Sequence, residues 1–159
     1  MSEIVEALSG KQIEQVRNLF REYHAELAQE YRTRGFEAEV SALPGLYAPP
    51  TGTLLLATVA GQPVGCVGLR PFPVDGDCEM KRLYVRPTFR GGTVGKDLVE
   101  RVLQQARALG YTRLRLDTHP PTMPAAVAMY RRLGFKEAAP DPAEKVEGLL
   151  YMDLLLTPL

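Results

Sequence analysis

The stretch from Leu83 to Lys96 constrains the fold more than any other part of the chain, because three local patterns follow one another there without interruption. Residues 83–85 have the pattern of a β-strand, three glycines follow, and an amphipathic helix begins near Val94. Glycine lets the backbone turn sharply, and the first amides of a helix have no acceptor within the helix. Such a turn gathers N–H groups at the positive end of the helix dipole. The segment therefore predicts a binding site for an anion such as pyrophosphate.

The residues of this turn do not match two familiar phosphate loops. A Walker loop needs a glycine where Arg90 stands and a serine or threonine where Asp97 stands. The glycine fingerprint of dinucleotide-binding folds is also absent, together with its acidic residue at the expected distance. The anion-binding residues that the turn predicts are Arg90, Gly91, Gly92, Thr93, Val94, Gly95 and Lys96.

The turn resembles the pyrophosphate loop of the GNAT superfamily of acyltransferases. In that family Gln/Arg-x-x-Gly-x-Gly/Ala follows a strand that ends in Leu-x-Val-x-Pro, and Arg90, Val94 and Gly95 fall on the loop pattern. Thr93 departs from it, because the family usually has glycine at that position. The resemblance extends over roughly residues 53–156.

A second block supports the same resemblance. Residues 123–135 are similar to the family pattern Asn-x-x-Ala-x-x-Leu-Tyr-x-x-x-Gly-Phe, with Tyr130 and the Gly-Phe pair in place. Met123 replaces the family's asparagine. The two blocks, at the separation that the family shows, make the resemblance specific.

The resemblance implies an α/β (α+β) fold in which one domain spans residues 1–159. Its sheet is mixed, mostly antiparallel and seven-stranded, with four helices, and two strands near the centre splay apart to admit the pantetheine arm of acetyl-coenzyme A. The backbone of Leu83 and Val85 would bind that arm, and an amide of Leu83 or Tyr84 would stabilise the oxyanion. Tyr130 would be the acid that protonates the departing thiolate. These roles imply an acetyl-coenzyme A-dependent N-acetyltransferase that uses no metal.

Glu79 is the predicted general base, because it is the one carboxylate within the strand that leads to the glycine turn. An ion pair with Lys81 or Arg82 competes with that role, and a water molecule can relay the proton instead of a dedicated base. Arg70 and Arg82 are candidates for attracting a carboxylate on the acceptor.

The rest of the chain predicts elements that fit such a sheet. Ser9 and Gln12 form a capping box for a helix expected to run to about Arg34. Strands are expected at 53–59 and 63–70, joined by a hairpin at Ala60-Gly61-Gln62, and at 78–85. A helix at 94–109 crosses over to a parallel strand at 112–118, and a helix at 123–133 and two final strands follow.

Composition excludes several classes of partner. The 159 residues include 19 basic and 19 acidic side chains, so neither nucleic acid nor an anionic membrane is an expected partner. Cys66 and Cys78 lack the spacing of a zinc or redox site and are expected in the core of a cytoplasmic protein. The expected partner is a small-molecule or peptide amine, and the protein is expected to be a monomer or a homodimer.

Two other functions remain open at this level. The departures at Thr93 and Met123 are compatible with a non-catalytic module that binds or senses acyl-coenzyme A. A nucleotide-binding protein that uses the same glycine turn is a weaker alternative.

Overall fold

The computed structural model describes residues 2–32, 34–120, 123–140, 142 and 145–157. Within them, strands form a seven-stranded sheet in the order β1-β2-β3-β4-β5-β7-β6, in which β4 and β5 are parallel and all other neighbours antiparallel. The strands are β1 (Glu3–Glu6), β2 (Thr53–Val59), β3 (Gln62–Pro71), β4 (Asp77–Val85), β5 (Arg113–Thr118), β6 (Lys136–Glu137) and β7 (Leu150–Leu155). The predicted hairpin joins β2 to β3, with Ala60 and Gly61 both at positive φ.

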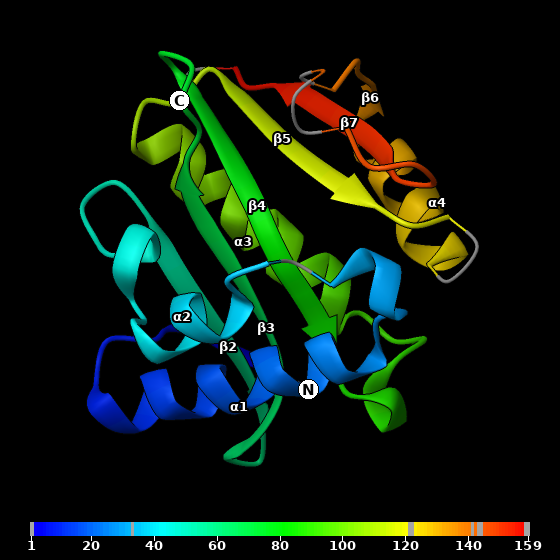
Figure 1. Ribbon diagram of the computed structural model, residues 1–159. Coiled ribbons are helices and arrows are strands. Elements are labelled where there is room, and N and C mark those ends of the chain that lie inside the picture. The colour runs from blue at the N-terminus through cyan, green and yellow to red at the C-terminus, as the bar shows by residue number, and fades with distance from the viewer. Residues whose placement is uncertain (1, 33, 121–122, 141, 143–144, 158–159) are drawn as a thin grey trace.

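Helices cover both faces of the sheet. Helices α1 (Gly10–Glu26) and α2 (Phe36–Ser41) lie on one face, and α3 (Val94–Ala108) lies on the other (Figure 1). The fourth, α4 (Pro124–Arg132), packs with the α3 layer. This arrangement confirms the predicted mixed sheet with four helices, to which the described residues add single 3₁₀ turns at Gln29–Tyr31, Gly45–Tyr47 and Pro87–Phe89. No helix in the described part of the chain is long and apolar enough to cross a membrane.

Helix α1 begins where the sequence predicts and ends earlier. The Ser9 hydroxyl accepts the Gln12 amide at 3.1 Å, and the Gln12 side chain accepts the Ser9 amide, so the capping box is complete. The helix ends at Glu26, because Leu27 adopts an extended conformation. The prediction of a helix to Arg34 was therefore wrong. Leu27 and Tyr31 continue the apolar periodicity of the helix, but their side chains line cavities instead of packing on the sheet.

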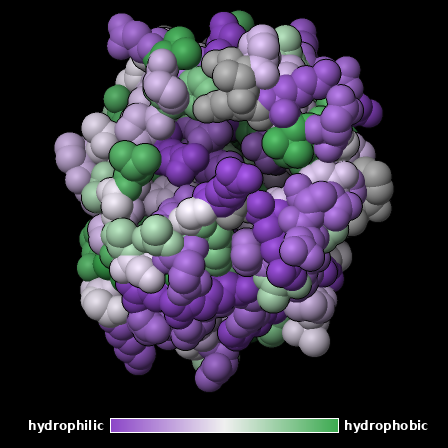
Figure 2. Space-filling model, in the orientation of Figure 1, coloured by the Kyte–Doolittle hydropathy of each residue, from purple (hydrophilic) through white to green (hydrophobic). Residues whose placement is uncertain are grey.

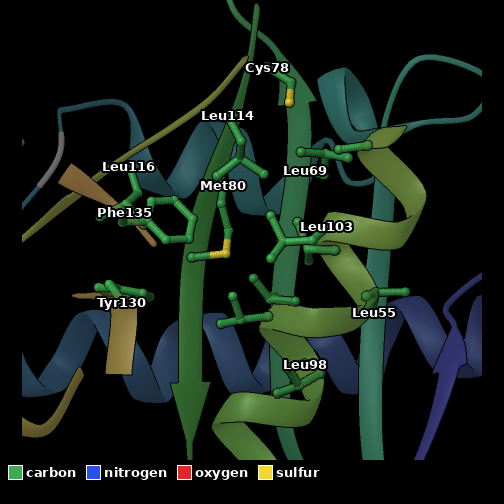
Figure 3. Packing of buried hydrophobic residues seen from close by; sticks show 14 of the residues in the cluster. Leu55, Leu69, Cys78, Met80, Leu98, Leu103, Leu114, Leu116, Tyr130 and Phe135 are labelled. Carbon is green, nitrogen blue, oxygen red and sulfur yellow. The ribbon is translucent and has the colours of Figure 1, made fainter. Parts of the chain in front are cut away.

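The sheet carries a core on each face. On the α3 side, Leu98 and Leu103 pack against Leu55, Leu69 and other strand residues (Figure 3). On the α1 side, Leu19 and Phe20 are fully buried. Each such side chain contributes about 1.5–3 kcal/mol through burial, so these two layers hold the sheet rigid beneath the site.

Both cysteines belong to these cores, as predicted. Cys66 and Cys78 are buried, and their thiols lie near the carbonyls of Arg82 and Arg113. Burial raises the pKa of Cys78 to about 12. Thiols held protonated in this way are poor nucleophiles.

The centre of the sheet opens where β4 and β5 separate. Their parallel ladder covers only Asp77 to Glu79 of β4, and the last three residues of β5 pair with β7 alone. Figure 1 shows the two strands diverging toward their C-terminal ends. A register shift in the β3–β4 ladder and a positive φ of 62° at Arg82 mark a bulge in the same stretch of β4. The predicted splay is therefore present, and it leaves one side of β4 without a neighbouring strand.

Candidate active site

Two cavities meet at the opening between β4 and β5. One, of about 900 Å³, is lined by the glycine turn and the end of β4, and we call it the loop cavity. The other, of about 630 Å³, is lined by arginines and charged residues of β3, β4 and β5, and we call it the arginine cavity. The residues that line both are Tyr23, Leu27, Tyr31, Leu83, His119 and Met123. A molecule bound in one cavity can therefore reach a molecule bound in the other.

The glycine turn presents its backbone to the loop cavity. Its lining residues are Arg90, Gly91, Gly92, Thr93, Gly95 and Lys96. The first amide with a helical acceptor is that of Asp97, which donates to the Thr93 carbonyl at 2.8 Å. Among the described residues, the amides of residues 91–96 donate no hydrogen bond. Six consecutive donors at a helix start form a site that suits phosphate oxygens.

Two of the predicted turn residues shape the turn without offering a side chain to a ligand. Val94 packs its side chain into the core beneath the turn, next to Gly65, so only its backbone is available. Gly91 has a φ of 87°, a conformation that glycine adopts without strain.

Arg90 is held at the edge of the loop cavity by three contacts. Its Nε donates to the Val85 carbonyl and its Nη2 to Glu26, each at 2.8 Å, and its guanidinium lies 5.5 Å from the centre of the Tyr84 ring. Burial alone would raise the pKa of Glu26, but the hydrogen bonds from Arg90 and Tyr84 outweigh it and lower that pKa. The positive charge beside the glycine turn is thus oriented by a carboxylate of α1.

The end of β4 directs backbone groups into the opening. Arg86 donates its amide to the Val64 carbonyl of the β3 side at 2.8 Å. Successive residues of a strand point their backbone groups in opposite directions, so the groups of Val85 and Leu83 face away from β3. The contact of Arg90 with the Val85 carbonyl agrees with this direction. By the same alternation the Tyr84 amide faces β3, and Tyr84 lines the loop cavity while its hydroxyl donates to Glu26 at 2.7 Å.

Tyr130 lies on α4 at the base of the arginine cavity. Its ring packs against Phe135 with centroids 5.6 Å apart, and Figure 3 shows the pair beside Leu116 and Met80. Burial raises the pKa of Tyr130, and the nearby Tyr23 and Asp117 raise it further. The Tyr130 hydroxyl therefore stays protonated at neutral pH, as a proton donor must.

Glu79 also lines the arginine cavity, but its ion pair is not one that the sequence suggested. Its carboxylate lies 3.0 Å from Nε of Arg70, the residue opposite it on β3. Lys81 instead pairs with Asp117 at 3.6 Å, and Arg82 with Glu39 at 3.1 Å. The prediction of Lys81 or Arg82 as the partner of Glu79 was wrong, because the facing strand brings Arg70 closer than either neighbour along β4.

Three residues at the junction of the cavities escaped sequence analysis. Tyr23 and Leu27 continue the apolar stripe of α1, so their pattern indicates core, not cavity lining. Tyr31 packs on His119, with ring centroids 4.1 Å apart, and so joins the turn after α1 to the end of β5. Burial raises the pKa of Tyr23, so the Tyr23 hydroxyl stays protonated at the junction. No local signal could have placed these side chains together.

Comparisons with known proteins identify the family and the fold of the chain. The sequence model described as the Acetyltransferase (GNAT) family matches residues 13–135. An uncharacterized N-acetyltransferase of Schizosaccharomyces pombe is 37% identical over 137 residues, which are 86% of this chain and 83% of that protein. The crystal structure of a putative acyl-CoA N-acyltransferase from Klebsiella pneumoniae has a TM-score of 0.76 at 25% identity, covering 99% of each chain. The PaiA N-acetyltransferase from Thermoplasma acidophilum, solved in complex with coenzyme A, shares the fold with a TM-score of 0.74 at 20% identity, covering 98% of this chain and 99% of that chain.

Proposed function

This chain belongs to the acetyltransferase (GNAT) family, and from that premise we propose that it transfers an acetyl group from acetyl-coenzyme A to a primary amine of a small molecule or peptide. One observation carries the proposal. The amides of residues 91–96, which lack acceptors among the described residues, belong to a turn that lines the loop cavity, and that cavity joins a second one at the opening beside β4. A diphosphate at the turn would place the rest of a long acyl carrier along β4.

In this proposal the cofactor is bound mainly by backbone. The amides of the glycine turn and the Arg90 guanidinium would hold the pyrophosphate. Leu83 and Val85, whose backbone groups face the opening, would bond the amides of the pantetheine arm as a neighbouring strand would. The bound thioester supplies the activated acyl group.

The acceptor amine would attack from the arginine cavity by direct transfer within a ternary complex. The Leu83 amide suits the developing oxyanion better than that of Tyr84, since it faces the opening. Tyr130 would donate its proton to the departing thiolate. Glu79 would accept a proton from the amine, directly or through water, although Arg70 already occupies one of its oxygens.

The decisive experiment measures binding and chemistry separately. Calorimetry with coenzyme A tests the loop cavity, and release of free thiol from acetyl-coenzyme A with a panel of amines tests transfer. Tyr130→Phe should lower kcat by about 100-fold and leave coenzyme A affinity unchanged, because general acid catalysis contributes on that scale. Tyr111→Phe is the matched control, since Tyr111 lines neither cavity.

Two outcomes would contradict the proposal. Coenzyme A binding without thiol release for any amine would leave only a binding module. Equal affinity for ATP and acetyl-coenzyme A would indicate a general phosphate site.

A further inference from the structure

The arginine cavity carries more positive than negative charge. Its charged lining consists of the cations Arg32, Arg34, Arg70, Lys81, Arg82 and Arg115 and the carboxylates Glu30, Glu79 and Asp117. Figure 2 shows hydrophilic residues around the hollow on this face of the molecule. A cavity lined in this way attracts anionic groups and repels cationic ones.

Four of these cations are held by carboxylates of the fold. Arg70 and Lys81 pair with Glu79 and Asp117 inside the cavity, as described above. Arg82 pairs with Glu39 behind the lining, and Arg115 lies 2.8 Å from an Asp77 oxygen. These ion pairs stabilise the cavity wall, and within each pair the two opposite charges neutralise each other.

Arg32 and Arg34 differ from those four. Both side chains are exposed at the cavity rim, and no ion pair joins either to a carboxylate within the described ranges. Arg32 donates from Nε to the Leu27 carbonyl at 3.2 Å and from Nη2 to the Ala25 carbonyl at 3.4 Å. These two bonds anchor the guanidinium at the end of α1 and leave Nη1 for another acceptor.

The position of these two arginines determines how far an anion bound to them lies from the junction of the two cavities. Arg32 follows Tyr31, which lines both cavities and packs on His119 at their junction. An anion bound by Arg32 is therefore close to the place where the amine must meet the thioester. The carboxylates Glu79 and Asp117 line the same cavity, each beside its own cation.

We propose that the acceptor is an amine that carries its own carboxylate a few bonds away, an amino acid rather than a polyamine or a simple alkylamine. Arg32 and Arg34 bind the carboxylate, and the amine points toward Leu83 at the junction. Guanidinium groups pair well with carboxylates, and a cavity of about 630 Å³ suits a molecule of this size. The inference rests on the proposed function, whose acceptor class it names.

Matched acceptors test the inference directly. L-Amino acids and their carboxamides differ in one charge, and the pair of lysine and cadaverine differs in one carboxylate. A carboxamide has the less basic amine, so more of it is in the reactive neutral form and intrinsic reactivity favours the amide. We expect kcat/KM at least about tenfold higher for the amino acids, as a charge-assisted hydrogen bond contributes on that scale. A preference for carboxamides or cadaverine would overturn the inference and leave the proposed function intact.

Substitutions test whether Arg32 and Arg34 are the residues that bind the carboxylate of the acceptor. The double variant Arg32→Gln/Arg34→Gln should raise KM for amino acids about tenfold and change KM for carboxamides less than about twofold. Arg107→Gln, a change of a cation that lines neither cavity, should alter neither value. Equal losses for both members of a pair in the double variant would overturn the inference.

A binding measurement tests the recognition of amino acids independently of acetyl transfer. Calorimetry of an amino acid against the coenzyme A complex should show binding that weakens in the double variant. If no amine is acetylated, the proposed function fails, and this titration still decides the inference. Unchanged or absent amino acid binding would then reject it.

Discussion

The loop cavity and the arginine cavity are built from different parts of the chain. The side of the loop cavity that we propose binds phosphate comes from one run of residues, 90–96, and would use backbone amides. The arginine cavity gathers charged side chains from β3, β4, β5 and the turn after α1. Backbone donors need only the right local conformation, whereas a set of side chains needs several elements to pack in register. Substitutions should therefore act on the first cavity mainly by steric hindrance and on the second through lost ion pairs.

The largest expected effect lies on the arginine side. Glu39→Ala should lower the free energy of unfolding by about 3 kcal/mol, because it leaves the Arg82 guanidinium buried without its carboxylate partner. Denaturant unfolding measures the loss. Glu37→Ala is the control, since Glu37 forms an exposed pair with Arg21 and its removal should cost less than about 0.5 kcal/mol. A loss for Glu39→Ala as small as that of the control would show that the buried pair does not support the cavity wall.

The second largest effect is expected from a substitution that fills part of the loop cavity. Gly95→Leu should lower coenzyme A affinity about 100-fold, which is about 2.7 kcal/mol, without lowering the melting temperature, because leucine favours helix and its side chain enters the cavity. Gly95→Ala is the matched control, since a Cβ there lies 3.7 Å from Val85 Cγ2, an ordinary contact. Calorimetric titration with coenzyme A gives both affinities. Unchanged binding by the leucine variant would exclude Gly95 from the cofactor site.

A smaller effect is expected for the one arginine of the glycine turn. Arg90→Gln should weaken coenzyme A binding about fivefold, roughly 1 kcal/mol, because the guanidinium is half exposed and already shared with Glu26. The loss should shrink as salt is added. Arg101→Gln, a change on α3 outside both cavities, should bind coenzyme A as the unaltered protein does. A larger loss for Arg101→Gln than for Arg90→Gln would contradict the placement of the pyrophosphate.

The smallest expected effect is on the stability of the protein at acidic pH. Burial alone would raise the pKa of Glu39, but Arg82 and Arg70 outweigh it and lower that pKa below its ordinary value. A carboxylate with a lowered folded-state pKa stabilises the fold above its unfolded pKa, and that stability is lost as pH falls through the folded pKa. The difference in melting temperature between the unaltered protein and Glu39→Gln should therefore narrow below about pH 4.3. A difference that stays constant to pH 3 would mean that Glu39 is not the titrating group.

The sequence predicted local features of the chain better than the ion pairs of the arginine cavity, and particular residues show why. Ser9 and Gln12 cap their own helix, and Gly91 bends its own turn, so these features are local. The predicted ion-pair partner of Glu79 was wrong, because the actual partner depends on which residue of β3 lies opposite Glu79. Leu27 and Tyr31 were assigned to a longer helix, because periodicity does not distinguish a side chain facing a core from one facing a cavity.

By itself, the sequence determined the strand, turn and helix that gather unpaired amides, and with them the family of the protein. Only the tertiary structure decided which charges pair, where β4 leaves β5, and that Tyr23, Tyr31 and His119 meet at the junction of two cavities. The physical reason is the distance along the chain over which each feature is set. Backbone conformation follows from adjacent residues, whereas the partners of a buried side chain depend on strand register and on the packing of helices against the sheet.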